Sequence, residues 1–177
     1  MHGVLTHDLY DWLRERHGDM ALLEVLALAK NPIGFVCLMA SSDDDFFAFI
    51  DGAAAVTAKP AAELLEDFGS YMAPSLLASH HELISPGWSA LDVIENTESI
   101  IHRAVRTQTR DATPPVLRSS RLADGSVRIV YASRRKLCHF ARGLIAGIGR
   151  SYGVTPVVEE PSCMLRGSDQ CELLITA

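Results

Sequence analysis

Residues 116–133, with the sequence VLRSSRLADGSVRIVYAS, decide the fold class of this chain. Two strand-like runs, Val116–Leu122 and Ser126–Ser133, flank the tripeptide Ala-Asp-Gly at residues 123–125, which is a turn signal between strands. Apolar and polar residues alternate along the second run, and one face of it carries Val127, Ile129 and Tyr131. The stretch therefore predicts an antiparallel β-hairpin.

The residues before the hairpin are predicted to be helical, from apolar residues at helical spacing and from start and stop signals. Gly18 ends a first helix, and Met20–Lys30 form a second one that Asn31-Pro32 stops. Two further helices begin at the acidic run Asp43–Asp45 and at Lys59-Pro60. After a loop at residues 79–87, a fifth helix spans about residues 89–107, and one side of it carries Leu91, Ile94, Glu98, Ile101 and Val105.

The residues after the hairpin add a helix and two strands. Leu137–Arg150 is predicted to be helical, and Thr155–Glu159 and Glu172–Ile175 are predicted strands. Helices followed by a ββαββ-like half indicate an α+β fold. We expect one domain over residues 1–177, with a mainly helical N-terminal lobe (1–87) and a C-terminal lobe (88–177) that contains a helix and an antiparallel sheet.

The composition excludes several classes of protein. The chain has 177 residues, of which 48% are hydrophobic and 21% charged, and its net charge is −6. Nucleic acid binding depends on clustered Lys and Arg, which an acidic chain without a long basic run does not offer. No stretch approaches the roughly 18 apolar residues that would span a bilayer. The N-terminus lacks the features of a secretory signal, so a cytoplasmic protein is expected.

Tyr131, Ser133 and Arg135 form a spaced row of hydrogen-bond donors. On a continuing strand these side chains would project from one face about 7 Å apart. Two hydroxyls and one guanidinium suit a ligand that carries two carboxylates, and the arginine could bind bidentately. An ordinary strand end with a surface arginine is the alternative.

His102 borders the apolar face of the fifth predicted helix. A lone histidine at such a place is usually a satisfied core residue, but a neutral imidazole is also a common axial ligand of haem iron. Pro114 and Pro115 follow twelve residues later and break the helix before the first strand. A rigid Pro-Pro edge could press against a flat ligand, although prolines that merely end a helix are common.

Taken together, these features resemble the H-NOX (haem nitric oxide/oxygen binding) family, which includes bacterial gas sensors and the haem domain of soluble guanylate cyclase. The resemblance rests on HRAVRTQTRDATPP at residues 102–115 and on YASRR at 131–135. MHGVL at residues 1–5 and AKPAAELLEDFG at 58–69 are similar as well, so the resemblance covers essentially the whole chain. The Tyr-x-Ser-x-Arg triplet is its most specific mark.

The resemblance implies a haem b between the two lobes, with His102 as its proximal ligand. It makes Tyr131, Ser133 and Arg135 the anchors of the propionates and makes Pro115 the residue that distorts the porphyrin. Family members that bind oxygen stably usually place a tyrosine on the helix after the triplet, and here that position is Phe140. The distal pocket candidates Leu5, Leu9 and Pro74 offer no replacement donor. The expected protein is therefore a sensor of NO and CO that excludes oxygen.

Three cysteines near the C-terminus, Cys138, Cys163 and Cys171, are candidate metal ligands, because zinc prefers four ligands in a tetrahedral array. Some family members bind zinc at such a cluster, with a histidine three residues before the last cysteine pair. Here that position is Glu160, so Glu160 or His139 would have to complete the site. A redox-active disulfide and inert buried thiols are the alternatives.

The resemblance also implies how the domain signals. NO binding would release strain held by Pro115, and the resulting conformational change would pass to a separate partner, a histidine kinase or a cyclic-di-GMP enzyme. A haem-free, V4R-like module that binds a small ligand or a metal is the main alternative, since it would need neither His102 nor the triplet. An enzyme is not expected, because the sequence shows no P-loop, no dinucleotide fingerprint and no convincing pair of nucleophile and base.

Overall fold

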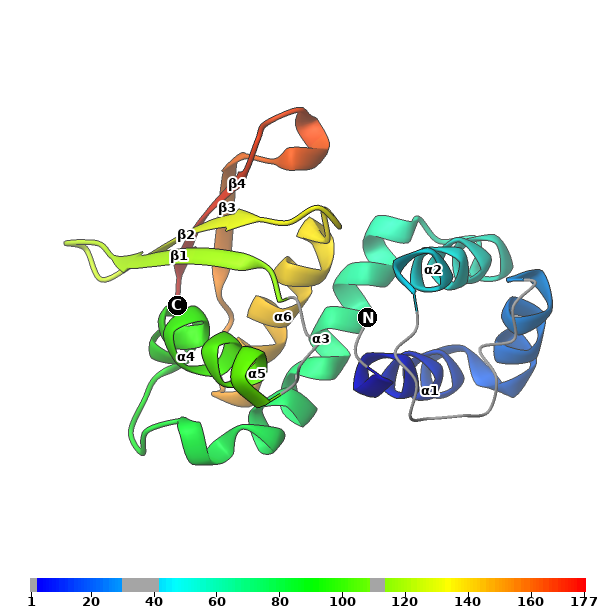
Figure 1. The fold of residues 1–177 in the computed structure, drawn as a ribbon, viewed down its shortest axis with the longest axis horizontal. Helices are drawn as coiled ribbons and strands as arrows, with labels where there is room; N and C mark the ends of the chain where they lie inside the picture. Colours follow the sequence, from blue (N-terminus) through cyan, green and yellow to red (C-terminus); the bar gives the residue numbers. More distant parts are fainter. Residues whose placement is uncertain (1–2, 30–41, 109–113) are drawn as a thin grey trace. The chain divides into compact units, whose positions relative to one another are not determined.

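The computed structural model describes residues 3–29, 42–108 and 114–177, and it excludes the side chains of residues 3–6. The helix stop predicted at Asn31-Pro32 lies outside these ranges. The chain forms two compact units, Met1–Phe68 and Gly69–Ala177. Figure 1 shows the helical first unit and the second unit that contains the sheet. No helix within the described ranges is long and apolar enough to cross a membrane.

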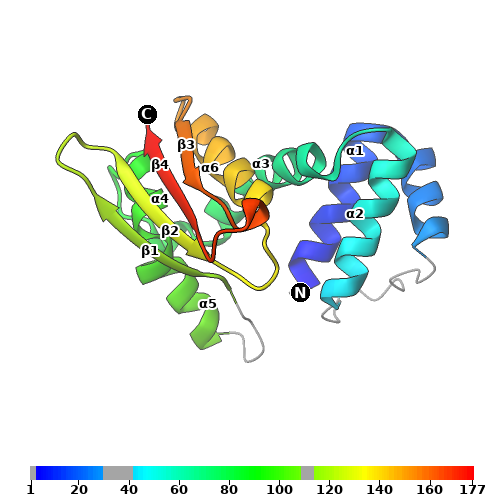
Figure 2. The same cartoon turned by 90° about the horizontal axis from the view of Figure 1, so that it is seen from above.

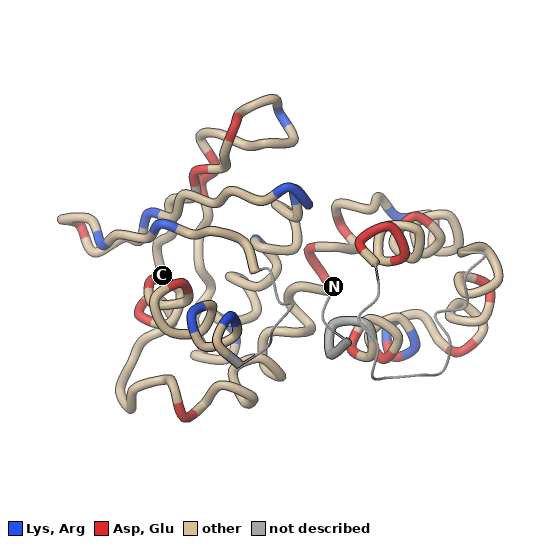
Figure 3. The backbone as a smooth tube through the Cα atoms, viewed as in Figure 1, with Lys and Arg blue, Asp and Glu red and all other residues tan. Residues whose placement is uncertain are grey.

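The first unit consists of helices packed around aromatic side chains. Helix α1 (Gly3–Leu28) is interrupted at Gly18, whose φ of 87° is left-handed, so Gly18 separates two helical segments as predicted. Helix α2 (Asp43–Thr57) begins with a capping box between Ser42 and Asp45. Figure 3 shows the acidic start of α2 in red. Helix α3 (Ala61–Ser79) follows Pro60.

Trp12 lies at the centre of this unit. Its side chain is fully buried, its ring centroid lies 5.4 Å from that of Phe68, and its indole nitrogen donates to Asp67 Oδ2 at 2.7 Å. The hydrogen bond satisfies the one polar group of a large apolar side chain. The same core contains Leu9, Leu13, Val25, Phe46, Phe49, Ile50, Ala53 and Leu64.

The second unit is built on a four-stranded antiparallel sheet with the order β1-β2-β4-β3. Its strands are β1 (Val116–Arg121), β2 (Val127–Ala132), β3 (Val157–Ser162) and β4 (Cys171–Thr176). The predicted hairpin and both later strands are therefore confirmed, and the α+β class with them. Figure 2 shows the strands side by side in this order.

Helices α4 (Ala90–Asn96) and α6 (Cys138–Ser151) supply the apolar side chains that cover one face of the sheet. The shared core consists of Ile94 from α4, Ile145 from α6, and Val127, Ile129, Tyr131, Leu173 and Ile175 from the sheet. Short helical turns, η1 (His81–Leu83) and η3 (Met164–Arg166), lie in the connections. The core places one face of β2 inward, as the alternation predicts.

The fifth predicted helix is present but not uniform. A π-helical turn, η2 (Thr97–His102), joins α4 to α5 (Arg103–Gln108). The amide of Arg103 donates to the carbonyl of Glu98 five residues earlier, which is the hydrogen bond that defines a π turn. π turns are rare and occur often at functional sites, and this one ends at His102.

The chain passes from the first unit to the second between Phe68 and Gly69, within α3. The physical reason is the close approach of the second half of α3 to α6. A Cβ added to Gly69 would meet the carbonyl oxygen of Phe140, and one added to Gly147 would lie 2.6 Å from the carbonyl oxygen of Ser70. Glycines thus let the two helix backbones touch, and the second half of α3, from Gly69 on, belongs to the second unit.

Candidate functional site

The proximal candidate His102 lies at the end of η2 with its side chain only 15% exposed. Its Nδ1 lies 3.0 Å from Glu98 Oε2. Because a carboxylate only accepts hydrogen bonds, this contact assigns the proton to Nδ1 and the lone pair to Nε2. Burial lowers the pKa of His102, while the hydrogen bond to Glu98 opposes that shift. The ring is thus favoured in the neutral form that binds metals.

The carboxylate of Glu98 is itself held in place. Arg106 donates to Oε1, and the amide of Leu117 donates to Oε2 at 3.2 Å. Burial alone would raise the pKa of Glu98, but the hydrogen bonds from Arg106, His102 and Leu117 outweigh it, so the pKa lies below its usual value. Glu98 stays ionised and connects the helix of His102 to the beginning of β1.

The register of the hairpin brings the predicted site residues to one end of the sheet. Val116 pairs with Ala132, so Pro115 just before β1 and Ser133 just after β2 lie at the same end. His102 joins them there, because its neighbour Glu98 binds Leu117. The backbone of Pro115 also interacts with the His102 ring and raises its pKa. Residues far apart in the sequence therefore share one location, although residues 109–113 lie outside the described ranges.

The triplet is not a row on one strand. Strand β2 ends at Ala132, and Ser133–Lys136 form a turn in which the amide of Lys136 donates to the Ser133 carbonyl at 3.2 Å. The Ser133 hydroxyl accepts from the Arg135 amide, also at 3.2 Å. The expectation of alternating side chains through Arg135 is wrong, because β1 begins opposite Ala132 and offers Ser133 no strand to pair with.

Tyr131 is the buried member of the triplet, with 3% of its surface exposed. Burial raises the pKa of Tyr131 to about 12, and a hydrogen bond to Ser133 opposes the rise. The phenol therefore remains a neutral donor at physiological pH. Tyr131, Ser133 and the Arg135 main chain are linked in one local network, whose donors suit a ligand with two carboxylates.

The candidates for the distal pocket are not all in the same unit as His102. Leu9 is buried in the core of the first unit, and Leu5 belongs to the residues whose side chains lie outside the description. Pro74 is an exposed residue within α3, and Phe140 is half-buried on α6. Pro74 and Phe140 belong to the same unit as His102, whereas Leu9 belongs to the other.

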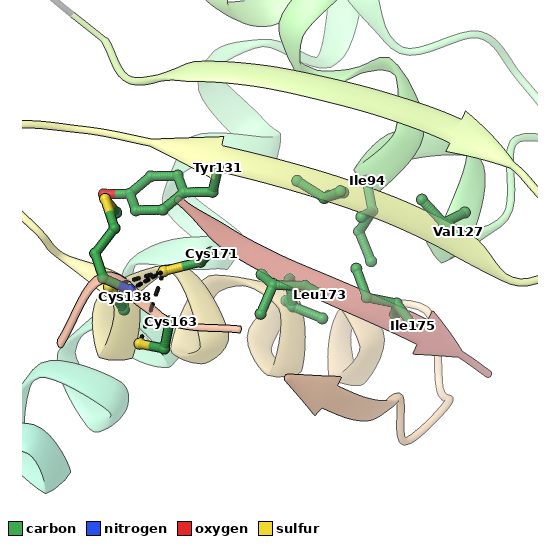
Figure 4. Close-up of a cluster of buried hydrophobic side chains, with 11 residues drawn as sticks. Ile94, Val127, Tyr131, Cys138, Cys163, Cys171, Leu173 and Ile175 are labelled. Atoms are coloured by element: carbon green, nitrogen blue, oxygen red, sulfur yellow. Dashed lines mark hydrogen bonds between the residues drawn. The ribbon is translucent and has the colours of Figure 1, made fainter. Parts of the chain in front are cut away.

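The three C-terminal cysteines form a compact buried cluster. Cys171 Sγ lies 3.2 Å from Cys138 Sγ and 3.7 Å from Cys163 Sγ, and all three sulfur atoms lie within 4.8 Å of one another. Figure 4 shows them meeting beside Tyr131. The Met164 amide points at Cys171 Sγ from 3.3 Å, which favours a thiolate, while burial raises the pKa of Cys171 and of Cys138.

Neither proposed fourth ligand joins this cluster. Within the described residues, the group of side chains close enough to share a metal is Cys138, Cys163 and Cys171. Glu160 Oε2 binds Arg166 instead, at 2.9 Å. Glu160 Oε1 and His139 Nδ1 are buried atoms without a hydrogen-bond partner. The structure therefore brings the three cysteines together and leaves the fourth ligand unassigned.

Glu98, which contacts His102, is not among the candidate site residues that the sequence indicates. It was predicted only as one of the residues along the apolar side of its helix. The spacing contained a signal, because Glu98 and His102 are four residues apart and side chains at that spacing are neighbours on a helix. The contact with Leu117 could not be predicted without the path of β1.

The donor set fits a haem. A neutral histidine with its lone pair on Nε2 suits the axial position, and the hydroxyls of Tyr131 and Ser133 with the nearby Arg135 suit two propionates. Both parts of this set lie at one end of one sheet. The residues present therefore match the cofactor that the resemblance implies.

Comparisons with known proteins also indicate a haem-binding protein. A family model described as "Haem-NO-binding" matches residues 2–160. A comparison with curated proteins gives no match. Similar solved structures include an H-NOX protein from S. oneidensis in the Fe(II)NO ligation state, with a TM-score of 0.89 and 21% identity over 99% of this chain and 98% of that one.

Two further solved structures show the same fold. The Fe(II) unliganded H-NOX protein from K. algicida has a TM-score of 0.88 and 16% identity, over 99% of this chain and 96% of that one. A mutant of the T. Tengcongensis H-NOX has a TM-score of 0.88 and 20% identity, over 99% and 97%. Because the family model covers most of the sequence and the fold agrees along its whole length, the chain belongs to the haem-NO-binding (H-NOX) family.

Proposed function

We propose that this member of a haem gas-binding family is a sensor of nitric oxide, with His102 as the axial ligand of a haem b. Tyr131, Ser133 and Arg135 would hold its propionates, and Pro115 would pack against the porphyrin. The single observation that carries the proposal is the convergence of His102, Pro115 and the triplet at one end of the sheet, with the His102 proton assigned to Nδ1. When bound, the haem iron supplies the coordination position that takes NO or CO.

The choice of gas follows from the residues that the resemblance assigns to the distal pocket. Bound oxygen carries partial negative charge and is stabilised by a hydrogen-bond donor, whereas NO binds ferrous haem strongly without one. Phe140, Leu9 and Pro74 have no side-chain donor. Structures of the S. oneidensis relative carry NO and CO on ferrous iron, which supports the same ligands here. We therefore propose a sensor of NO and CO that excludes oxygen.

The family assignment favours this function over its alternatives. H-NOX domains are haem sensors and not enzymes, in agreement with the expectation from sequence. A haem-free V4R-like module would not need His102 and the triplet, which the structure brings together. We propose that a conformational change reports gas binding to a separate protein, a histidine kinase or a cyclic-di-GMP enzyme.

A spectrum of the reduced, haem-loaded protein before and after NO, CO and air tests the proposal. We expect a Soret band that shifts with NO and CO but not with air. The variant His102→Gly should lose the histidine-ligated spectrum and regain it with imidazole, while the matched control His139→Gly should retain it. A protein that stays colourless with haemin supplied would refute the haem assignment.

The cysteine cluster supports a second proposed site, for structural zinc. Zinc–sulfur bonds of about 2.3 Å in a tetrahedron place ligand sulfur atoms about 3.8 Å apart. Cys171 Sγ lies 3.7 Å from Cys163 Sγ and 3.2 Å from Cys138 Sγ, and all three sulfur atoms lie within 4.8 Å of one another. Metal analysis of protein purified under reducing conditions should give one zinc per chain. The variant Cys171→Ser should lose it, and equal zinc content in the two proteins would exclude the site.

A further inference from the structure

Glu98 contacts His102, Leu117 and Arg106. Its Oε2 atom lies 3.0 Å from His102 Nδ1 and accepts from the Leu117 amide at 3.2 Å, and its Oε1 accepts from Arg106. The Glu98 side chain is 23% exposed and that of His102 is 15% exposed. The carboxylate is thus anchored on three sides in a site with limited access to water.

These anchors distinguish Glu98 from the other acidic residues of the same helix. The carboxylate of Glu95 binds Arg121 at 2.9 Å, and that of Asp92 binds Arg121 and caps the helix at Ser89. Both bind the far end of β1, away from Leu117. Within the described residues, Glu98 is the carboxylate that contacts the His102 ring.

A carboxylate fixed on Nδ1–H changes what the other ring nitrogen can do. It draws the proton of Nδ1 toward itself, which increases the electron density on Nε2 and makes the imidazole a stronger base. It also fixes the orientation of the ring, because the carboxylate is held by Leu117 and Arg106 and cannot follow a rotating histidine. A more basic axial ligand stabilises ferric over ferrous iron, and hydrogen bonding to a ligand is one of the ways in which a protein tunes haem.

We propose that Glu98 is the positioning residue of the axial histidine, that it gives His102 partial imidazolate character, and that it thereby strengthens the bond of His102 to iron and lowers the reduction potential. This inference rests on the proposed haem ligation by His102. Glu98 Oε2 contacts both the His102 ring and the Leu117 amide. The carboxylate therefore fixes the position of His102 relative to the first residues of β1.

The variant Glu98→Gln tests the proposal, because it removes the charge and nearly preserves the shape. In the reduced, haem-loaded protein we expect the iron–histidine stretching frequency, measured by resonance Raman, to shift downward and the reduction potential to rise. Haem release should also accelerate, since losing such a hydrogen-bond partner commonly costs about 10–100-fold in metal affinity. The matched control is Glu95→Gln, which removes a carboxylate one turn earlier and should leave the frequency and the potential unchanged.

Equal frequency and potential in wild type and Glu98→Gln would overturn the inference, and so would an equal shift in Glu95→Gln. A wild-type protein without histidine-ligated haem would instead refute the proposed function, so the two failures are distinguishable. If Glu98→Gln does not fold, the wild type supplies the readout. In its 15N-labelled, reduced CO complex, the His102 Nδ1 proton should exchange slowly with water and resonate downfield; rapid exchange would overturn the inference.

Discussion

Tyr131 on β2 lies directly opposite Cys171 on β4, so the candidate haem anchor and the sulfur cluster share one core. Figure 4 shows the phenol beside the three sulfur atoms. A negative charge on Cys138 or Cys171 would raise the pKa of Tyr131 further. A change in the charge of the cysteine cluster would therefore change the pKa of Tyr131, which belongs to the same core.

The variant Tyr131→Phe should hold haem less tightly. It keeps the buried ring and removes the hydroxyl that interacts with Ser133. A hydrogen bond contributes about 1 kcal/mol, so we expect haem transfer to apomyoglobin to become about five- to tenfold faster. Tyr152→Phe, at the end of α6, is the control and should transfer haem at the wild-type rate. An unchanged rate in Tyr131→Phe would contradict its role as an anchor.

The stability of the haem-free protein should fall at alkaline pH because of Tyr131. Its pKa is raised from about 10 to about 12 in the folded state, mainly by burial. Between these values the unfolded chain loses the phenol proton and the folded chain keeps it. The free energy of unfolding should thus be fully retained below about pH 10 and then fall by about 1.4 kcal/mol per pH unit. Urea unfolding of wild type and Tyr131→Phe measures the difference, and parallel pH dependences would argue against it.

Gly69→Ala should destabilise the second unit. The added Cβ would collide with the Phe140 carbonyl oxygen and lie 3.0 Å from the Leu144 amide, and backbone atoms cannot move aside as side chains do. We expect a loss of about 1–3 kcal/mol in urea unfolding. The control Gly52→Ala meets the flexible Val25 side chain at 3.3 Å, so its helix propensity gain should offset the crowding. Equal effects of the two variants would disprove the tight contact of α3 with α6.

The cysteines of the metal-free protein should resist alkylation at pH 8. Cys138, Cys163 and Cys171 are at most 3% exposed, and burial raises the pKa of Cys138 and Cys171. Because the thiolate is the reactive form, iodoacetamide should modify these residues quickly only after urea is added. Peptide mapping by mass spectrometry gives the extent of modification at each residue. Rapid modification of the native protein would mean that the cluster opens readily.

Phe140→Tyr should add oxygen binding to the haem-loaded protein. The new hydroxyl would supply the donor that the wild-type residue lacks, at a half-buried position on α6. We expect the reduced variant to show a Soret shift in air that the wild type does not show. Phe140→Leu, which offers no hydroxyl, is the matched control. Identical spectra of Phe140→Tyr and Phe140→Leu in air would show that position 140 does not control oxygen binding.

Local signals in the sequence predicted most of the fold. The hairpin turn, the interruption at Gly18 and the acidic start of α2 each depend on a few neighbouring residues. These features are readable because their causes lie within a few positions of one another.

Features that depend on distant contacts were not predicted correctly. The end of β2 at Ala132 follows from where β1 begins. The contact of Glu98 with Leu117 joins residues 19 positions apart. The cysteine cluster was predicted as a set of candidate ligands, but its place beside Tyr131 required the register of β2 and β4.

The helical segment from α4 to α5, which carries His102, is bound to the sheet by ion pairs at its beginning and contains a π turn further along. Asp92 and Glu95 fix its first turns to Arg121, and the π turn Thr97–His102 follows them. A π turn contains about one residue more than an α turn, and one residue corresponds to about 100° of rotation around a helix axis. Converting the π turn to α geometry would therefore rotate His102 and α5 about the helix axis, while Asp92 and Glu95 of α4 stay bound to Arg121 of β1. Such a conversion would turn the His102 side chain about the helix axis relative to α4.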